Sequence, residues 1–219
     1  MNVALIVFAG KGTRINSSIP KQFIKINGKD LVVYTIEKFE NSRYIDEIIL
    51  VTHKDYVDYV KDLVLYYHLN KVRYIIQGGE TRQESVKKGL EKSRYSDDDI
   101  ILIHDGDRPL VDDNIIKNNI DLVKDYNAVC TFIYHDEAFR SASNLGRTKK
   151  LGDRDIDVQT PQSFRYGLIK KYHQMKENEQ FSDDIGLVEK DYDVCYVKGS
   201  PFNFKVTTDI DLTLIKSIM

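Results

Sequence analysis

The sequence predicts an α/β fold with a single doubly wound, mostly parallel sheet over residues 1–219. Two patterns predict it. Short apolar runs rich in β-branched residues alternate with segments of helical periodicity, as they do in a chain of βαβ units. Within each run the apolar residues are continuous, which is typical of strands that are buried on both faces. A length of 219 residues fits one large domain of this class.

The elements follow one another in a regular order along most of the chain. Strands are predicted at residues 3–8, 47–52, 73–77, 100–104 and 128–134. Helices are predicted between them, at residues 31–41, 55–67, 82–92 and 113–124. A helix near 166–175, a strand at 195–198 and a final helix from residue 208 complete the series. Ligands of such sheets bind beyond the carboxyl ends of the strands, so the loops that follow strands are where we expect chemistry.

The alternation lapses at residues 135–157, which are polar and charged and show no helical period. One interpretation is a mobile surface loop. The other is a projecting arm or lid, because a structureless loop of this length inside a compact domain is usually functional or disordered. The sequence leaves both open.

Composition excludes several classes of protein. The chain has 32 basic and 34 acidic residues, for a net charge of −2, which argues against a protein that coats nucleic acid. Hydrophobic residues make up 42%, enough for a core, but no apolar run approaches the roughly 20 residues of a membrane span. The first apolar run lacks the basic flank and the length of a signal peptide. Cys130 and Cys195 lie in strand-like contexts and are expected to be free thiols. We therefore expect a cytoplasmic protein with no nucleic-acid or membrane partner.

The loop after the first strand has the residues of a phosphate site. Gly10 and Gly12 allow close backbone approach, and consecutive amides can form an anion-binding nest. Lys11, Arg14 and Lys21 add three cations around this turn, which suits a polyphosphate. The spacing is neither a Walker loop nor a dinucleotide-binding motif. A plain turn at the end of a strand is the alternative.

An ordered set of motifs carries a resemblance to a known family. Residues 9–14 read Ala-Gly-Lys-Gly-Thr-Arg, and residues 20–23 read Pro-Lys-Gln-Phe. Further motifs follow in order at residues 78–86, 104–109, 159–164, 182–184 and 203–207. This set resembles the Rossmann-like nucleotidyltransferase family that includes methylerythritol-phosphate and ribitol-phosphate cytidylyltransferases, and the resemblance covers nearly the whole chain.

The resemblance implies a role for each matching position. It implies that Arg14 and Lys21 are the catalytic cations. Nucleotide-binding roles are implied for Ala9, Gly10, Gly12, Thr13, Gly78, Gly79, Arg82, Ser85, Asp105 and Lys205. Acceptor-binding roles are implied for Arg108, Arg154, Thr160 and Ser182. Asp105 matches the metal-associated aspartate of the family, so Mg²⁺ or another divalent cation is the expected cofactor.

Some of these residues also have ordinary structural interpretations. Thr81 and Glu84 have the spacing of a helix capping box. Asp184 has the position to cap a helix that begins at Ile185. His104 looks like a general base, but its motif favours a structural role. Lys205 is expected on a strand.

Two positions and the arm depart from the family pattern. Asp107 stands where a small or apolar residue is common, and we expect it to pair with Arg108 so that it does not repel a phosphate. Phe202 stands where an acidic or small polar residue often precedes the asparagine, which puts a second aspartate ligand in doubt. The arm has no aligned match for the family's arginine; Arg154 is the best candidate and Arg147 the other.

The resemblance implies CMP transfer from CTP to a small polyol phosphate, giving a CDP-polyol and pyrophosphate. A pentitol phosphate such as ribitol 5-phosphate is the expected acceptor, and 2-C-methyl-D-erythritol 4-phosphate of isoprenoid biosynthesis is the alternative. A non-catalytic nucleotide-binding regulator is the alternative from another class. The resemblance also implies a homodimer that forms through residues 135–157.

Overall fold

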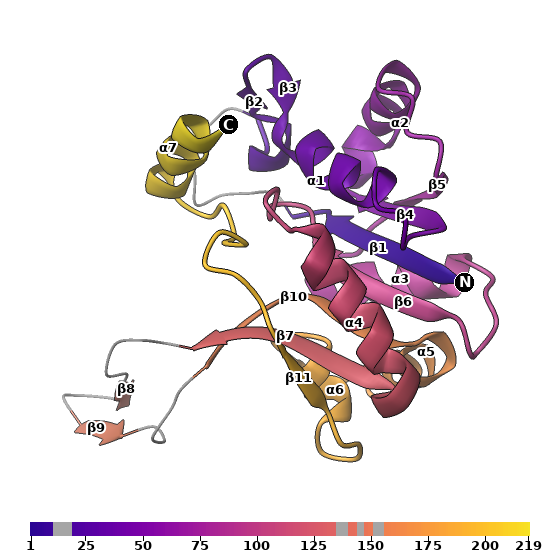
Figure 1. The fold of residues 1–219 in the computed structure, drawn as a ribbon, viewed down its shortest axis with the longest axis vertical. Helices are drawn as coiled ribbons and strands as arrows, with labels where there is room; N and C mark the ends of the chain where they lie inside the picture. The colour runs from indigo at the N-terminus through magenta and orange to yellow at the C-terminus, as the bar shows by residue number, and fades with distance from the viewer. Residues whose placement is uncertain (11–18, 135–139, 144–146, 151–155) are drawn as a thin grey trace.

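A seven-stranded sheet forms the centre of the molecule (Figure 1). The computed structural model describes residues 1–10, 19–134, 140–143, 147–150 and 156–219, with the backbone alone at 140–143 and 147–150. Across the sheet the strands are β11 (Cys195–Lys198), β7 (Ala128–Tyr134), β10 (Ile156–Arg165), β6 (Ile100–Asp105), β1 (Asn2–Phe8), β4 (Glu47–Thr52) and β5 (Val72–Gln77). Neighbouring strands are parallel except where β10 pairs antiparallel with β6 and β7. The mostly parallel sheet confirms the predicted fold class.

Helices cover both faces of this sheet. One buried cluster joins the sheet to α1 (Leu31–Glu40), α2 (Val57–Tyr66) and α4 (Asp113–Tyr126). The other joins it to α3 (Arg82–Lys92), α5 (Tyr166–Met175) and α6 (Ile185–Val188). Successive residues of β1 alternate between the two clusters, Ala4 and Ile6 in the first, Leu5 and Val7 in the second. Burial on both faces explains why the strand residues are apolar without alternation.

Strand β10 is the strand of the seven-stranded sheet that the sequence analysis missed. Its polar residues and Pro161 obscure the sequence pattern of a strand, because proline cannot donate a hydrogen bond to a sheet ladder and is rare in central strands. The structure accommodates the proline with an irregularity: the register against β7 shifts between Gln159 and Gln162. The last two residues of the expected arm, 156 and 157, belong to β10, which pairs Ile156 with Tyr134.

The segment between β7 and β10 contains a hairpin. Strands β8 (Arg140–Ser143) and β9 (Arg147–Lys150) pair antiparallel with each other. Figure 1 shows them standing away from the seven-stranded sheet, at the end of the extended β7 and β10. The sequence analysis, which left a mobile loop and a projecting arm or lid open, did not predict these two strands. Their sequences, Arg-Ser-Ala-Ser and Arg-Thr-Lys-Lys, are almost entirely polar. They lack the alternation of apolar and polar residues by which strands are usually identified.

The C-terminal part folds back over the N-terminal part. Helix α7 (Asp209–Ile218) contributes Ile215 to a small buried cluster with Val206, Leu31 and Ile26. Ile26 lies in the hairpin of β2 (Lys25–Ile26) and β3 (Lys29–Asp30), just after the 3₁₀ helix η1 (Lys21–Phe23). A second 3₁₀ helix, η2 (Lys54–Tyr56), precedes α2.

Two expectations from the sequence concern this part of the fold. The strand expected around Lys205 is absent: residues 204–207 have no regular structure, although the Val206 N–H donates to the Asp107 carbonyl at 2.8 Å. The two cysteines are free, as expected. Burial raises the pKa of the Cys130 thiol to about 12. Within the described part of the chain, no helix has the length and apolar character needed to cross a bilayer.

Candidate active site

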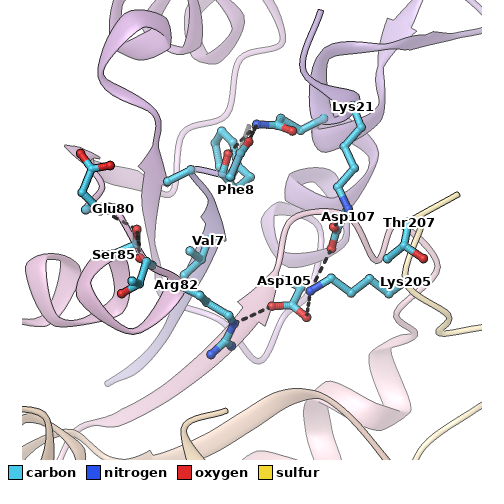
Figure 2. A pocket seen from close by; sticks show the side chains of 15 residues that line it. Val7, Phe8, Lys21, Glu80, Arg82, Ser85, Asp105, Asp107, Lys205 and Thr207 are labelled. Carbon is cyan, nitrogen blue, oxygen red and sulfur yellow. Dashed lines mark hydrogen bonds and ion pairs between the residues drawn. The ribbon is translucent and has the colours of Figure 1, made fainter. Parts of the chain in front are cut away.

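A pocket lies at the carboxyl ends of β1 and β6, facing the start of α3 (Figure 2). Parallel strands of a doubly wound sheet place their following loops at this edge. The pocket brings together most of the predicted nucleotide-binding residues that the structure describes. Its lining includes Ala9, Gly10, Lys21, Gly79, Arg82, Ser85, Asp105, Asp107 and Lys205.

A buried glutamine side chain fixes the backbone at the end of β1 and the start of the following loop. Gln22 is buried, and its side-chain amide donates to the carbonyls of Phe8 and Gly10, both at 2.8 Å. The sequence analysis gave this residue no role, although it stands in the Pro-Lys-Gln-Phe motif. Predicted site residues Gly12, Thr13 and Arg14 lie outside the described residues.

The loop before α3 packs tightly against the loop after β1. A Cβ atom at Gly78 would lie 2.5 Å from the Ala9 Cβ, so only glycine permits this approach. The Ser85 hydroxyl accepts the Gly79 N–H at 3.0 Å and donates to the Thr81 carbonyl at 2.8 Å. Ser85 therefore shapes the turn that forms one wall of the pocket.

The predicted capping box at α3 forms only in part. The Thr81 hydroxyl accepts the Glu84 N–H at 3.1 Å, which is an ordinary N-cap. The Glu84 carboxylate, however, accepts the N–H of Glu80 at 2.8 Å and so stabilises the loop one residue earlier than a capping box would.

Asp105, the last residue of β6, is the centre of charge in the pocket. Its carboxylate accepts Arg82 Nε and Lys205 Nζ, each at 3.0 Å, and Arg108 Nε lies at 3.4 Å (Figure 2 shows the first two). Burial by itself would raise the pKa of Asp105, but the charges of Arg82, Lys205 and Arg108 hold it well below the usual range. Asp105 is therefore an anion that gathers three cations, of which Arg82 and Lys205 come from distant parts of the chain and Arg108 from the adjoining turn.

Arg82 connects this centre to a second buried carboxylate. Its Nη1 donates to Asp184 at 2.7 Å, and Asp184 also lies 3.1 Å from His173 Nε2. Burial opposes ionisation of Asp184, but Arg82 and His173 lower its pKa. Asp184 makes no capping hydrogen bond to α6, so the capping alternative is wrong. His173 had no place in the sequence analysis, because nothing in its local pattern separates it from an ordinary core histidine.

Lys21 and Asp107 pair in a way that the sequence did not predict. The Lys21 ammonium donates to the Val206 carbonyl at 2.8 Å and forms an ion pair with Asp107. The expected pair of Asp107 with Arg108 is absent: Arg108 reaches Asp105, and its Nη1 donates to the Asn203 carbonyl at 2.8 Å. Arg108 is therefore engaged by Asp105 and by the segment around Asn203.

His104 behaves as a buried structural residue. Its Nε2 donates to the Arg108 carbonyl at 3.2 Å, which leaves Nδ1 as the acceptor for the Thr160 hydroxyl at 3.0 Å. The same hydroxyl accepts the Asp105 N–H at 3.1 Å. Burial lowers the pKa of His104 to about 3, so the ring is neutral near neutral pH. The network fixes the backbone from which the Asp105 carboxylate projects.

A second pocket adjoins the first and contains the predicted acceptor-binding residues that the structure describes. Arg108, Thr160 and Ser182 all line it. Arg154, the fourth, lies outside the described residues. Arg82, Asp105 and Lys205 line both pockets, and they form the wall that the two pockets share.

Side-chain amides hold the second pocket together, and the sequence analysis missed all of them. Gln162 accepts the N–H groups of Asp184 and Ile185 at 2.9 and 3.0 Å. Asn203 donates to the Thr160 carbonyl at 2.8 Å. Both residues stand inside motifs that were quoted, and their placement next to predicted site residues is the signal that could have identified them.

The donor set permits a divalent cation on the Asp105 side of the first pocket. Among the described residues, no group of three or more His, Cys, Asp or Glu side chains gathers to form a complete metal site. Mg²⁺ needs only one or two protein carboxylates when phosphate oxygens and water supply its other ligands. Asp105 and Asp107 line the same pocket, and Oδ1 of Asp107 is buried without a hydrogen bond from any described residue. Phe202 is 65% exposed and offers no ligand there.

Comparisons with known proteins agree with this geometry. The family model described as IspD, 2-C-methyl-D-erythritol 4-phosphate cytidylyltransferase, matches residues 2–219. A 2-C-methyl-D-erythritol 4-phosphate cytidylyltransferase of Clostridium novyi is 41% identical over 100% of this chain and 96% of its own length. A ribitol-5-phosphate cytidylyltransferase of Vibrio parahaemolyticus is 37% identical with the same coverage.

Solved structures lead to the same family. The crystal structure of 4-diphosphocytidyl-2C-methyl-D-erythritol synthase from Anaerococcus prevotii superposes with a TM-score of 0.86 at 28% identity, covering 99% of this chain and 95% of that one. The relatives carry the names of enzymes, in agreement with the catalytic reading of the motifs. The chain therefore belongs to the 2-C-methyl-D-erythritol 4-phosphate cytidylyltransferase family and is a nucleotidyltransferase.

Proposed function

We propose that this enzyme transfers CMP from CTP to a small polyol phosphate. An oxygen of the acceptor phosphate attacks the α-phosphorus of CTP, the bond from that phosphorus to the bridging oxygen breaks, and pyrophosphate leaves. The observation that carries the proposal is the wall of Arg82, Asp105 and Lys205 shared by the two pockets. Because the two pockets adjoin at these residues, ligands bound in them have their reacting phosphates close together. This proximity is the main requirement of such a reaction.

The protein's own groups suit this chemistry. The attacking phosphate is already an anion near neutral pH, because its second pKa is about 6, so no basic side chain is needed to activate it. The neutral, buried His104 fits that requirement. What the reaction needs is positive charge for the transition state, and we assign this role to Lys21 and to Arg14.

The remaining predicted residues divide between the two pockets. We assign nucleotide binding to Ala9, Gly10, Gly12, Thr13, Gly78, Gly79, Arg82, Ser85, Asp105 and Lys205. Arg82 keeps one buried nitrogen, Nη2, without a hydrogen bond to any described residue, which leaves a donor for a phosphate oxygen. Asp105 would hold Mg²⁺, which on binding supplies positive charge to the phosphate oxygens.

A pentitol phosphate such as ribitol 5-phosphate is the acceptor that we propose. The second pocket supports it, because its lining is mostly polar, and the exposed Ser182 offers a hydroxyl that can bond to one of the acceptor's hydroxyl groups. 2-C-methyl-D-erythritol 4-phosphate is the second candidate, supported by the 41% identical relative of that name. We assign the acceptor's phosphate to Arg108, and to Arg154 of the arm.

The arm also supports a proposal about assembly. The β8–β9 hairpin stands away from the sheet (Figure 1), where a second copy of the chain can contact it. We propose a homodimer that forms through residues 135–157. Sedimentation of the full chain and of a chain with this hairpin shortened tests it, and a monomeric full chain contradicts it.

Release of pyrophosphate tests the reaction directly. Purified enzyme is given Mg²⁺ and CTP with ribitol 5-phosphate, 2-C-methyl-D-erythritol 4-phosphate or another polyol phosphate, and pyrophosphate is measured against time. We expect release that requires both CTP and one acceptor, with ribitol 5-phosphate giving the highest kcat/KM. Release with methylerythritol phosphate alone supports the second candidate. No release with any acceptor, from a protein that is folded, contradicts the proposal.

A further inference from the structure

Asp107 lies between Lys21 and Lys205, the two lysines that line the first pocket among the described residues (Figure 2). Its Oδ2 forms the ion pair with Lys21, and its Oδ1 lies 3.9 Å from Lys205 Nζ. The residue is only 8% exposed, yet Oδ1 accepts no hydrogen bond from any described residue. A buried carboxylate oxygen without a donor is uncommon in folded proteins and calls for an explanation.

The position of Asp107 is unfavourable for a site that binds polyphosphate. The cations of the first pocket, Lys21, Arg82 and Lys205, are all paired with carboxylates in the described structure. A nucleoside triphosphate that binds here must compete with the carboxylates for these cations. Its phosphates must also come close to the negative charge of Asp107. Like charges at close range oppose binding unless a cation comes between them.

Asp105 and Asp107 approach one cation from two sides. Lys205 Nζ lies 3.0 Å from Asp105 Oδ2 and 3.9 Å from Asp107 Oδ1, so both carboxylate oxygens already face a single positive group. Two carboxylates at one pocket edge, with phosphate oxygens to complete the shell, match the way in which proteins bind Mg²⁺.

We propose that Asp107 exchanges partners during nucleotide binding. Without nucleotide it holds Lys21; with nucleotide it joins Asp105 as a second carboxylate ligand of the divalent cation that accompanies CTP, and Lys21 passes to the phosphates. This inference rests on the proposed function. It gives a role to the buried Oδ1 of Asp107, which accepts no hydrogen bond from any described residue.

Calorimetry of CTP binding tests the exchange without relying on turnover. The dissociation constant is measured with excess Mg²⁺ and with EDTA, for the wild type and for Asp107→Asn. The ratio of interest is the dissociation constant in EDTA divided by the one in Mg²⁺. We expect Asp107→Asn to reduce this ratio about tenfold, a change typical of the coupling between two ligands. Affinity in EDTA should rise, because the variant removes repulsion and frees Lys21. Affinity in Mg²⁺ should fall, because the metal loses a ligand.

Asp98→Asn is the matched control. Asp98 is exposed and lies just before the opposite end of β6, so this variant changes the net charge equally but away from the pocket. It should keep the wild-type ratio. Asp107→Ala provides a second variant if asparagine disturbs folding, and it should change the ratio in the same direction. Mn²⁺ bound with CTP should show an altered electron paramagnetic resonance spectrum in both Asp107 variants.

The outcomes separate two kinds of failure. A folded wild type that binds no CTP in either buffer contradicts the proposed function itself. A wild type that binds CTP with a strong Mg²⁺ dependence, which both Asp107 variants retain, overturns the exchange and leaves Asp107 as a static partner of Lys21. An unchanged Mn²⁺ spectrum in these variants also overturns it.

Discussion

Lys21 combines features of a structural residue and of a catalytic one. In the described structure its ammonium binds Asp107 and the Val206 carbonyl, so it is held in place at the pocket wall. We expect Lys21→Ala to lower kcat by roughly 100- to 1,000-fold, because loss of one fixed group that stabilises transition-state charge costs about 2.7–4 kcal/mol. The affinity for CTP should fall much less, since the added charge appears mainly in the transition state.

Lys25→Ala is the control for that variant. Lys25 lies four residues further on and is exposed, so its removal changes the net charge equally without touching the pocket. Steady-state rates and calorimetry on both variants make the comparison. A folded Lys21→Ala enzyme that turns over like the wild type would show that this lysine only stabilises the loop.

His104 predicts how stability depends on pH. Its pKa is about 3 in the folded protein, against an ordinary value of 6.5, because burial disfavours the charged ring. Between these two values the unfolded chain binds a proton that the folded one does not, so the free energy of unfolding falls as the pH falls below 6.5. The contribution is about 1.4 kcal/mol per pH unit. Above pH 6.5 the ring is neutral in both states, so His104 adds no slope there.

Urea unfolding at several pH values between 6 and 5 measures this contribution. In that window the carboxylates with lowered pKa, Asp105 and Asp184, remain charged in both states and add little to the slope. We expect His104→Gln to be less stable at pH 7 but to have the shallower slope, by about 1.4 kcal/mol per pH unit. Equal slopes for the variant and the wild type would contradict a neutral His104.

At the scale of residues, the sequence predicts the members of the site better than their partners. Lys21, Arg82, Asp105 and Lys205 were expected near the nucleotide, and they line one pocket. The pairing of Asp107 with Lys21 was not foreseen, because it depends on how side chains from separate loops meet. Motif position shows which residues gather at a sheet edge, but it does not show which of several cations forms an ion pair with a given carboxylate.

The N-terminus of α3 connects an element's stability to the pocket. Thr81 caps this helix, and its carbonyl also accepts the Ser85 hydroxyl within the same turn. We expect Thr81→Ala to lower the free energy of unfolding by about 1 kcal/mol, the usual cost of losing such a cap. Thr81→Ser should restore most of it, because serine keeps the hydroxyl. Urea unfolding of the three proteins tests this, and equal stability of the alanine variant would contradict the cap.

At the scale of elements, the sequence predicts those whose burial leaves a periodic signal. Six strands of the large sheet have near-continuous apolar runs, and all six were expected. Strand β10 was missed because its buried residues include Gln159, Thr160 and Gln162, whose polar groups bond to neighbouring loops and side chains. Buried polar residues placed on a central strand remove the apolar pattern by which a strand is identified.

The whole molecule should respond to the nucleotide that it selects. A ligand at 100 times its dissociation constant adds about 2.7 kcal/mol to the stability of the folded state. For a chain of this size that corresponds to a rise in Tm of about 5–10 °C. We expect CTP with Mg²⁺ to produce this rise in thermal unfolding, and UTP, ATP and GTP at the same concentration to produce much less. Equal shifts with all four nucleotides would contradict selection of cytosine.

The wall shared by the two pockets has a thermodynamic consequence for catalysis. Since Arg82, Asp105 and Lys205 face both pockets, a ligand that draws one of these charges toward itself changes the field felt by the other ligand. The coupling is reciprocal: whatever factor CTP applies to the affinity for the acceptor, the acceptor applies to the affinity for CTP. Dissociation constants measured for each substrate alone are therefore expected to differ from those in the ternary complex, by one common factor.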